Sequence, residues 1–217
     1  MSGRWRWLGV IAAAAFAIAL VAFGAMLDGF SHGRHPVALL GAIGVPYALA
    51  FNLLAFVLPG LLACLLAWRV RAVLSDASAL AARLGWRLVF LSALAFTGQG
   101  LLPLDPGDLD ARPSRLHAVA WTLWWVAFVP GALLLAWSAW RGPSRRRASG
   151  FAHAAAGGLV LAFATLLGAS LGAAIAQRLA YAVWFAWLAW AGWSTARDAG
   201  VIRGAASGPG SSPPARR

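Results

Sequence analysis

Long apolar runs separated by clusters of arginine are the feature that most constrains how this chain can fold. The first run extends from Leu8 to Leu27 and is bounded by Arg6 and Asp28. A helix needs about 20 mostly apolar residues to cross the hydrocarbon core of a bilayer, and this run has that length. The chain as a whole is 61% hydrophobic and 11% charged, whereas soluble domains are about 25% charged. This composition excludes a soluble enzyme, a disordered chain and a disulfide scaffold, and it indicates an integral membrane protein.

Six apolar runs of this kind can be drawn along the sequence. The predicted spans are residues 8–27, 46–68, 84–102, 117–140, 151–174 and 178–196. We therefore predict an all-α fold, a single bundle of six transmembrane helices formed by residues 1–203. The remaining segment, residues 204–217, has no apolar period and is rich in Gly, Ser and Pro. Such a composition is typical of a disordered tail.

Two of the span boundaries depend on turn-forming residues inside long apolar stretches. The stretch from Val37 to Trp68 is too long for one straight span, and Pro46 suits the first turn of a helix. We therefore expect residues 37–45 to form a short interfacial or re-entrant piece that does not continue the span. Residues 151–196 would make a helix about twice as long as a bilayer is thick. Gln177-Arg178 is the polar place at which we expect this stretch to turn back.

The distribution of basic residues predicts an orientation. All 18 basic residues are Arg, and fourteen of them fall on the N-terminus and every second connection after it. The four on the other side are Arg34, Arg112, Arg115 and Arg178. Cytoplasmic loops carry the excess of positive charge in membrane proteins, so we predict that both termini are cytoplasmic. The net charge of +12 follows from these clusters, and with no basic helix face or aromatic-basic motif we expect no nucleic-acid partner.

Polar residues that do not suit a lipid environment fall on the predicted outer side. They are Asn52, Gln99, Asp105, His117, Gln177 and Arg178. Polar groups at membrane depth are costly and tend to face the bundle interior or a wet cavity. We therefore predict that they share an outward-facing polar pocket, in which Asn52, Gln99, Gln177 and Arg178 bind a ligand.

Two interpretations of this pocket remain open. In the structural one, Arg178 pairs with Asp105, and His117 packs against them to hold the helices together. In the functional one, Arg178 holds a phosphate or carboxylate, while Asp105 and His117 form an acid/base pair that acts in catalysis. Both interpretations use the same side chains, and the sequence does not decide whether the protein is an enzyme.

The histidines raise the question of a metal or haem. His117 and His153 are predicted at opposite ends of their spans, about 30 Å apart, so they cannot share one haem. His32 and His35 lie in the first outer loop, where they could join an outer ligand set with Asp28 or Asp105. Loop histidines are usually solvated, and ligand count alone does not make a site. We expect neither a metal nor a cofactor, and leave open whether His32 and His35 join the outer pocket.

A resemblance to a known family is carried by three segments: HPVALLGAIGVPYALAFNLLAFVLPGLL, then GQGLLPLDP followed by LHAVAW, then AQRLAYAVWFAWL. Over about residues 8–196 the chain resembles the bacterial membrane family called domain of unknown function 998. The resemblance implies a six-span layout. It also implies that the family's recurrent features map onto Asn52, the turn from Gly100 to Asp105, His117 and Gln177-Arg178. It implies no reaction and no substrate.

These observations lead to a functional hypothesis. We predict a multi-pass protein of a bacterial inner membrane that binds, and in one version processes, a lipid or small amphiphile in the outer pocket. The alternative is a non-enzymatic structural or sensory partner of another membrane protein. No ATP-binding motif is present in the sequence, so energy-coupled transport would require a partner.

Overall fold

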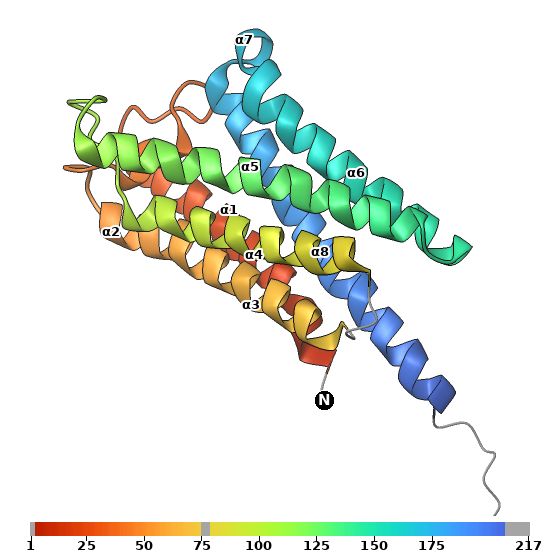
Figure 1. Cartoon of the computed structure of the whole chain (residues 1–217). Helices are drawn as coiled ribbons and strands as arrows, with labels where there is room; N and C mark the ends of the chain where they lie inside the picture. Colours follow the sequence, from red (N-terminus) through yellow and green to blue (C-terminus); the bar gives the residue numbers. More distant parts are fainter. Residues whose placement is uncertain (1–2, 75–78, 207–217) are drawn as a thin grey trace, which may run out of the picture.

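The computed structural model describes residues 3–74 and 79–206, and all of the regular structure in these two ranges is helical (Figure 1). The predicted all-α fold is therefore confirmed. The first half comprises η1 (Gly3–Trp7), α1 (Leu8–Met26), η2 (Val37–Gly41), α2 (Ala48–Phe51), η3 (Asn52–Val57), α3 (Leu58–Val73) and α4 (Leu80–Leu101). The second half comprises α5 (Arg112–Trp140), η4 (Ser144–Arg146), α6 (Arg147–Leu161), η5 (Ala162–Leu166), α7 (Gly168–Leu171) and α8 (Ala173–Ala206).

Five helices in the described part of the chain are long and apolar enough to cross a membrane. They are Arg4–Met26, Ala48–Ala72, Leu80–Leu101, Arg112–Trp140 and Arg147–Leu166. The sixth predicted span lies in α8, which is not among these five and carries Gln177 and Arg178 near its start. The count of six spans and their orientation in a membrane stay predictions.

The helices pack side by side, and α8 lies between α1 and α6, with its C-terminal part projecting beyond the other helices (Figure 1). Helix α4 packs against α3 and α5, α5 packs against α6, and α8 contacts both α1 and α6. Aromatic rings fill the centre. Phe96 lies 4.8 Å from Trp184 and 5.3 Å from Tyr181 between ring centroids, and Phe16 lies 4.8 Å from Phe185. All of these rings are buried, so the core that unites α1, α4 and α8 is largely aromatic.

Glycine permits the close contact between the N-terminal segment and α8. A Cβ atom built on Gly9 would collide with the carbonyl oxygen of Leu188, and one built on Gly192 would lie 2.8 Å from the carbonyl oxygen of Arg6. Small residues let two helix backbones approach closely in membrane proteins. Residues 6–9 and 188–192 therefore lie against each other with no room for a side chain between them.

The predicted break before the second span is confirmed. Residues 37–41 form the short helix η2, and the chain then turns through Gly44 and Tyr47, whose φ angles are +82° and +61°. A positive φ is uncommon for a residue other than glycine. The helix begins at Ala48 rather than at Pro46, because Tyr47 with its left-handed conformation cannot belong to a right-handed helix.

The predicted turn at Gln177-Arg178 is wrong. The chain reverses at Gly172, which has a φ of +83°, and both Gln177 and Arg178 lie inside α8. A left-handed residue is accommodated best by glycine, so backbone conformation, rather than polarity, placed this turn. Helix α8 also continues past the predicted end at residue 196 to Ala206. The rest of the predicted tail, residues 207–217, lies outside the described residues.

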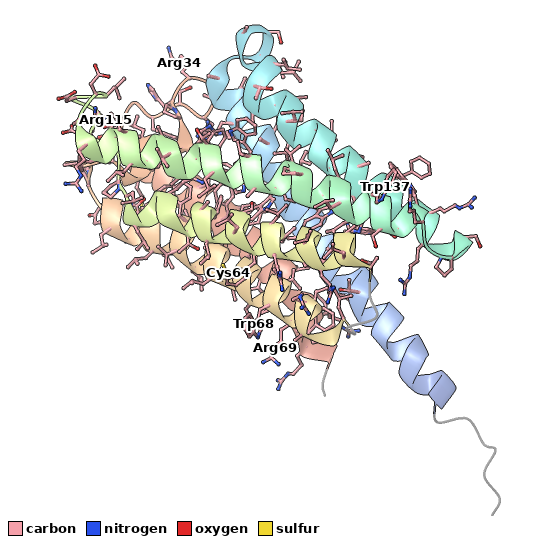
Figure 2. The ribbon with its side chains drawn as sticks, viewed as in Figure 1. Arg34, Cys64, Trp68, Arg69, Arg115 and Trp137 are labelled. Carbon is pink, nitrogen blue, oxygen red and sulfur yellow. The ribbon has the colours of Figure 1, made fainter. Side chains whose placement is uncertain are left out.

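The bundle has two dissimilar ends. We call the end formed by residues 27–47, 102–111 and 167–172 the loop end, since it carries the long connections. We call the opposite end the arginine end; it contains η1, the end of α3, the start of α4 and residues 141–147. Figure 2 labels Arg34 and Arg115 at the loop end and Trp68, Arg69 and Trp137 towards the arginine end.

Candidate functional site

Three of the predicted ligand-binding residues bind the backbone of the first loop, residues 27–47. Asn52 Nδ2 donates to the carbonyl oxygen of Gly41 at 2.8 Å. Gln177 Oε1 accepts from the amide of Val37 at 3.0 Å. Backbone groups at membrane depth must find partners inside the protein, since lipid offers none. Asn52 and Gln177 therefore hold non-helical chain against the bundle.

Arg178 makes the third of these connections. Its Nη1 donates to the carbonyl oxygens of His35 and Ala174, both at 2.9 Å. Its Cζ lies 5.9 Å from the ring centroid of Phe30. The Nε and Nη2 atoms are buried and have no hydrogen-bond partner among the described residues. The guanidinium is thus fixed by two backbone carbonyls and an aromatic ring, with donor capacity left over.

The predicted grouping of Asp105, His117 and Arg178 is not formed. Asp105 Oδ1 accepts from the amide of Gly107 at 2.9 Å, and His117 Nδ1 lies 2.9 Å from the carbonyl oxygen of Leu102. Both side chains thus bind backbone groups of the loop that joins α4 to α5. Within the described residues, no carboxylate forms an ion pair with Arg178. A carboxylate two residues before a turn amide readily accepts from that amide, and this local bond engages Asp105 within its own loop.

Gln99 lies deeper than the other predicted residues. Tyr181 donates its hydroxyl hydrogen to Gln99 Oε1 at 2.5 Å, and both side chains are fully buried. Gln99 Nε2 is also buried, and no residue in the described part of the chain is its hydrogen-bond partner. This pair links α4 to α8 inside the aromatic core, so Gln99 does not share a pocket with the first loop.

The loop histidines do not assemble a ligand set. His35 Nδ1 accepts from the amide of Ser31 at 3.0 Å, and Phe30 packs against both His32 and His35 with centroid distances of 5.1 and 5.6 Å. Across residues 3–74 and 79–206, no group of three or more His, Cys, Asp or Glu side chains is placed to hold a metal ion.

A cavity of about 330 Å³ opens at the loop end between the first loop, α5, η5 and α8. Its polar lining residues are Arg34, Thr165 and Gln177, and its large apolar ones are Trp121 and Phe163. Small residues of α7 and α8 form the remaining wall. Of the six predicted site residues, only Gln177 lines it.

Sequence reasoning missed most of this lining. Arg34 was one of only four arginines predicted on the outer side, and this unusual position could have marked it as a candidate site residue. Thr165 and Phe163 carried none, because both lie in an apolar run with no distinctive pattern. They line the same cavity as Arg34 because the chain reverses at Gly172 and returns α8 alongside η5, and α8 binds the first loop through Gln177.

An all-helical bundle with five apolar helices and a cavity at one end is consistent with a membrane-embedded protein. The sequence model of one protein family, described as "Protein of unknown function (DUF998)", matches residues 10–194 of the chain. The chain therefore belongs to this family, as the sequence resemblance had indicated. No curated protein and no solved structure matched the chain in the comparisons.

Proposed function

We propose that this protein binds a lipid or a small amphiphile in the loop-end cavity. The observation that carries the proposal is a cavity of about 330 Å³ whose lining combines three polar residues, Arg34, Thr165 and Gln177, with the aromatic rings of Trp121 and Phe163. Ligand pockets typically measure about 300–1,000 Å³ and combine apolar walls with a few polar groups. A volume at the lower end of this range suits a small headgroup and one short chain.

The polar lining residues favour an anionic or hydrogen-bonding headgroup. Arg34 is exposed, and its guanidinium can bind a phosphate or carboxylate through two parallel hydrogen bonds. Gln177 uses Oε1 to accept from Val37, which leaves its amide hydrogens to donate. Thr165 donates to the carbonyl oxygen of Leu161 at 2.7 Å, so its hydroxyl oxygen can accept.

The apolar lining residues favour an apolar chain. Trp121 and Phe163 are both half-buried and line the cavity from α5 and η5. Their rings supply apolar contact for a chain, and the small residues of α7 and α8 leave the room that the chain would occupy. The proposal is therefore binding of an amphiphile.

Catalysis is not included in this proposal. Asp105 and His117 do not line the cavity, and each binds a backbone group of the loop between α4 and α5. An acid/base pair has to reach the reacting group of a substrate. These two residues therefore bind backbone groups of their own loop and do not belong to the cavity lining.

The proposed location is a bacterial inner membrane, with the arginine end in the cytoplasm. The arginine bias supports the orientation, and the family resemblance supports the bacterial membrane. Cysteine labelling tests it, because Cys64 is the single cysteine of the chain. In a Cys64→Ala background, Gly33→Cys should react with an impermeant maleimide on whole cells, and Ser144→Cys should react only after permeabilisation. The reverse pattern would overturn the orientation.

Ligand binding is tested by comparing two arginines of the loop end. Arg34→Gln should lose lipids that co-purify with the wild-type protein, as measured by mass spectrometry of extracted lipid. Arg115→Gln is the matched control, since Arg115 is exposed at the same end and does not line the cavity. Ala164→Phe, which fills the cavity, should have the same effect as Arg34→Gln. Identical lipid profiles in all four proteins would reject the proposal and favour the structural or sensory role.

A further inference from the structure

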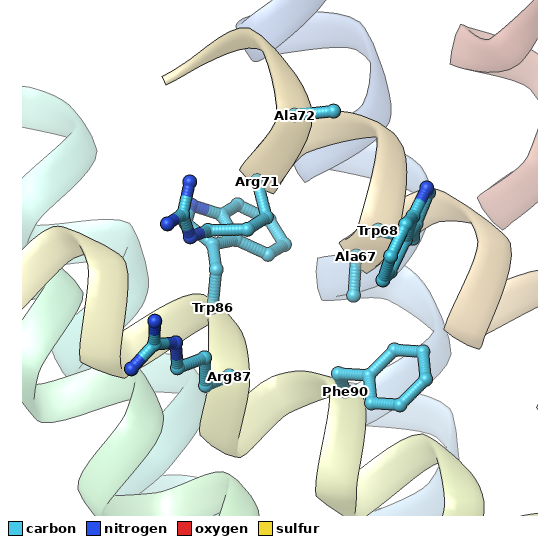
Figure 3. A pocket seen from close by; sticks show the side chains of 7 residues that line it. All are labelled: Ala67, Trp68, Arg71, Ala72, Trp86, Arg87 and Phe90. Atoms are coloured by element: carbon cyan, nitrogen blue, oxygen red, sulfur yellow. The ribbon is translucent and has the colours of Figure 1, made fainter. Parts of the chain in front are cut away.

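A second, larger cavity lies at the arginine end, where two spans finish. It measures about 400 Å³ and opens between the last turns of α3 and the first turns of α4 (Figure 3). Its lining consists of Trp68, Arg71, Trp86, Arg87, Phe90 and two alanines. We call it the arginine-end groove. It shares no lining residue with the loop-end cavity.

Two arginines form one side of the groove. Figure 3 shows Arg71 and Arg87, which come from the two facing helices, with their guanidinium groups on the same side of the groove. Arg71 is half-buried and Arg87 is exposed. No carboxylate belongs to the described lining residues. An anion between the two guanidinium groups would therefore meet two positive charges, with donors suited to phosphate oxygens.

Aromatic rings form the other side. Trp68 and Phe90 lie across the groove from the arginines, with 6.4 Å between their ring centroids. Trp68 is 63% exposed, whereas Trp86 is buried against Trp187 at 5.7 Å. An exposed tryptophan at the end of an apolar span is typical of headgroup depth in a membrane. This side of the groove is therefore suited to contact with lipid rather than with water.

The groove lies at the end of one span and in the first turns of the next, which agrees with headgroup depth. The apolar segment that contains α3 ends at Ala72, and the one that contains α4 begins at Leu80. Arg71 therefore lies at the very end of one span, and Phe90 lies about three turns into the next. A ligand in the groove would place its charged group at the membrane surface and its apolar region deeper in the bilayer.

We propose that the arginine-end groove binds an anionic phospholipid, with the phosphate between Arg71 and Arg87 and the glycerol and upper acyl region along Trp68 and Phe90. This is a site distinct from the amphiphile cavity at the loop end and does not depend on it. A free phosphate would use the two arginines but not the aromatic wall. A phospholipid uses both, and it is present wherever the groove faces a bilayer.

The test measures lipid binding to the purified full-length protein in detergent by native mass spectrometry. The probes are phosphatidylglycerol, which is anionic, phosphatidylcholine, which is zwitterionic, and inorganic phosphate as a competitor. Wild type should prefer phosphatidylglycerol. The Arg71→Gln/Arg87→Gln variant should bind it about 10–30-fold more weakly, since each arginine near an anionic surface contributes about a factor of five. Binding of phosphatidylcholine should not change.

A matched control separates the groove from general surface charge. Arg4→Gln/Arg69→Gln removes the same charge from exposed arginines of the same end that do not line the groove. This control should keep the preference for phosphatidylglycerol. If it loses the preference to the same extent, the proposal is overturned. Displacement of phosphatidylglycerol by millimolar inorganic phosphate would also overturn it, because the groove would then be a simple anion site.

A second variant keeps the proposal testable if the double variant does not fold. Ala72 is exposed and lines the groove. Ala72→Glu therefore adds a negative charge that repels a phosphate, and it removes no side chain that binds the lipid. It should weaken phosphatidylglycerol binding while the thermal unfolding of the protein is unchanged. Unchanged binding in this variant would contradict a phosphate position between the two arginines. Arg34→Gln should leave this binding unaltered, which separates it from the loop-end proposal.

Discussion

Polar side chains at the loop end bind backbone groups, whereas arginines at the arginine end lie on aromatic rings or beside a groove. Arg178 binds the carbonyl oxygens of His35 and Ala174. At the other end, the Cζ atom of Arg6 lies 4.6 Å from the ring centroid of Trp193, and that of Arg141 lies 4.3 Å from that of Trp137. The same residue type therefore serves two purposes in one bundle.

The difference follows from the length of the connections. The first loop, residues 27–47, contains much chain outside regular helix, and its amides and carbonyls need partners. Helices α5 and α6 are joined at the arginine end by a few residues, so few backbone groups there lack partners. Buried polar side chains are placed where non-helical chain lies against a membrane bundle. Several polar residues predicted at the same end of a bundle can thus indicate a loop that is bound by side chains as readily as a ligand pocket.

The largest expected effect is that of Arg178→Ala. This variant removes two charged hydrogen bonds and the contact with Phe30, and hydrogen bonds to charged groups contribute about 1.5–3 kcal/mol each. We expect the free energy of unfolding to fall by about 2–3 kcal/mol, which is the value of one such bond, because only the bond to His35 joins separate elements and Ala174 belongs to α8 itself. Arg178→Lys should recover some of the loss. The measurement is denaturant-induced unfolding in mixed micelles.

A double-mutant cycle then tests whether Arg178 has an acidic partner. Since Asp105 accepts from Gly107 and Arg178 donates to His35 and Ala174, Asp105→Asn and Arg178→Ala should be additive within about 0.5 kcal/mol, as expected of independent sites. A coupling energy well above that value would show an ion pair in the folded protein and would contradict the division between the two ends.

The contact between Gly41 and Asn52 should give an intermediate effect. Asn52→Ala leaves the carbonyl of Gly41 without a buried donor, a loss of about 1–3 kcal/mol. Gly41→Ala should also destabilise, because its Cβ atom would collide with Asn52 Oδ1. The collision disappears once Asn52 is alanine, so Gly41→Ala should cost less in the Asn52→Ala background. Equal costs in both backgrounds would mean that Asn52 does not hold η2.

The smallest expected effect is at the arginine end. Arg6→Gln removes the contact of the guanidinium with Trp193, and an exposed interaction of this kind contributes about 0.5–1 kcal/mol. Arg4→Gln is the control, because Arg4 is exposed and should have no measurable effect on thermal unfolding. A loss for Arg6→Gln as large as that for Arg178→Ala would remove the contrast between the two ends.

Much of the fold could be predicted because it depends on short-range patterns. Apolar runs of about 20 residues located five membrane-length helices, and Pro46 with the glycines before it predicted the break ahead of the second one. The turn between α6 and α8 was misplaced. Gln177 and Arg178 looked like a surface pair, but Gly172 provides the left-handed residue that the reversal uses.

The candidate site was less predictable than the fold. The sequence indicated that Asn52, Gln177 and Arg178 belong to one end of the bundle, and the structure places all three against the first loop. Their partners could not be predicted, because these are backbone atoms that every residue carries and no pattern identifies. The burial of Trp86 against Trp187 could not be predicted for a similar reason, since ring packing depends on which helices become neighbours.

The sequence by itself determined the class of protein, the apolar helices and the separation of arginines into clusters. These follow from transfer of side chains between water and lipid, which is a property of each residue and its near neighbours. Tertiary structure alone decided that Arg178 binds a loop carbonyl instead of Asp105, that Gln99 meets Tyr181, and that Arg71 and Arg87 lie on the same side of one groove. Each of these contacts joins separate elements, and hydrogen bonding acts over about 3 Å, so they depend on how the helices pack.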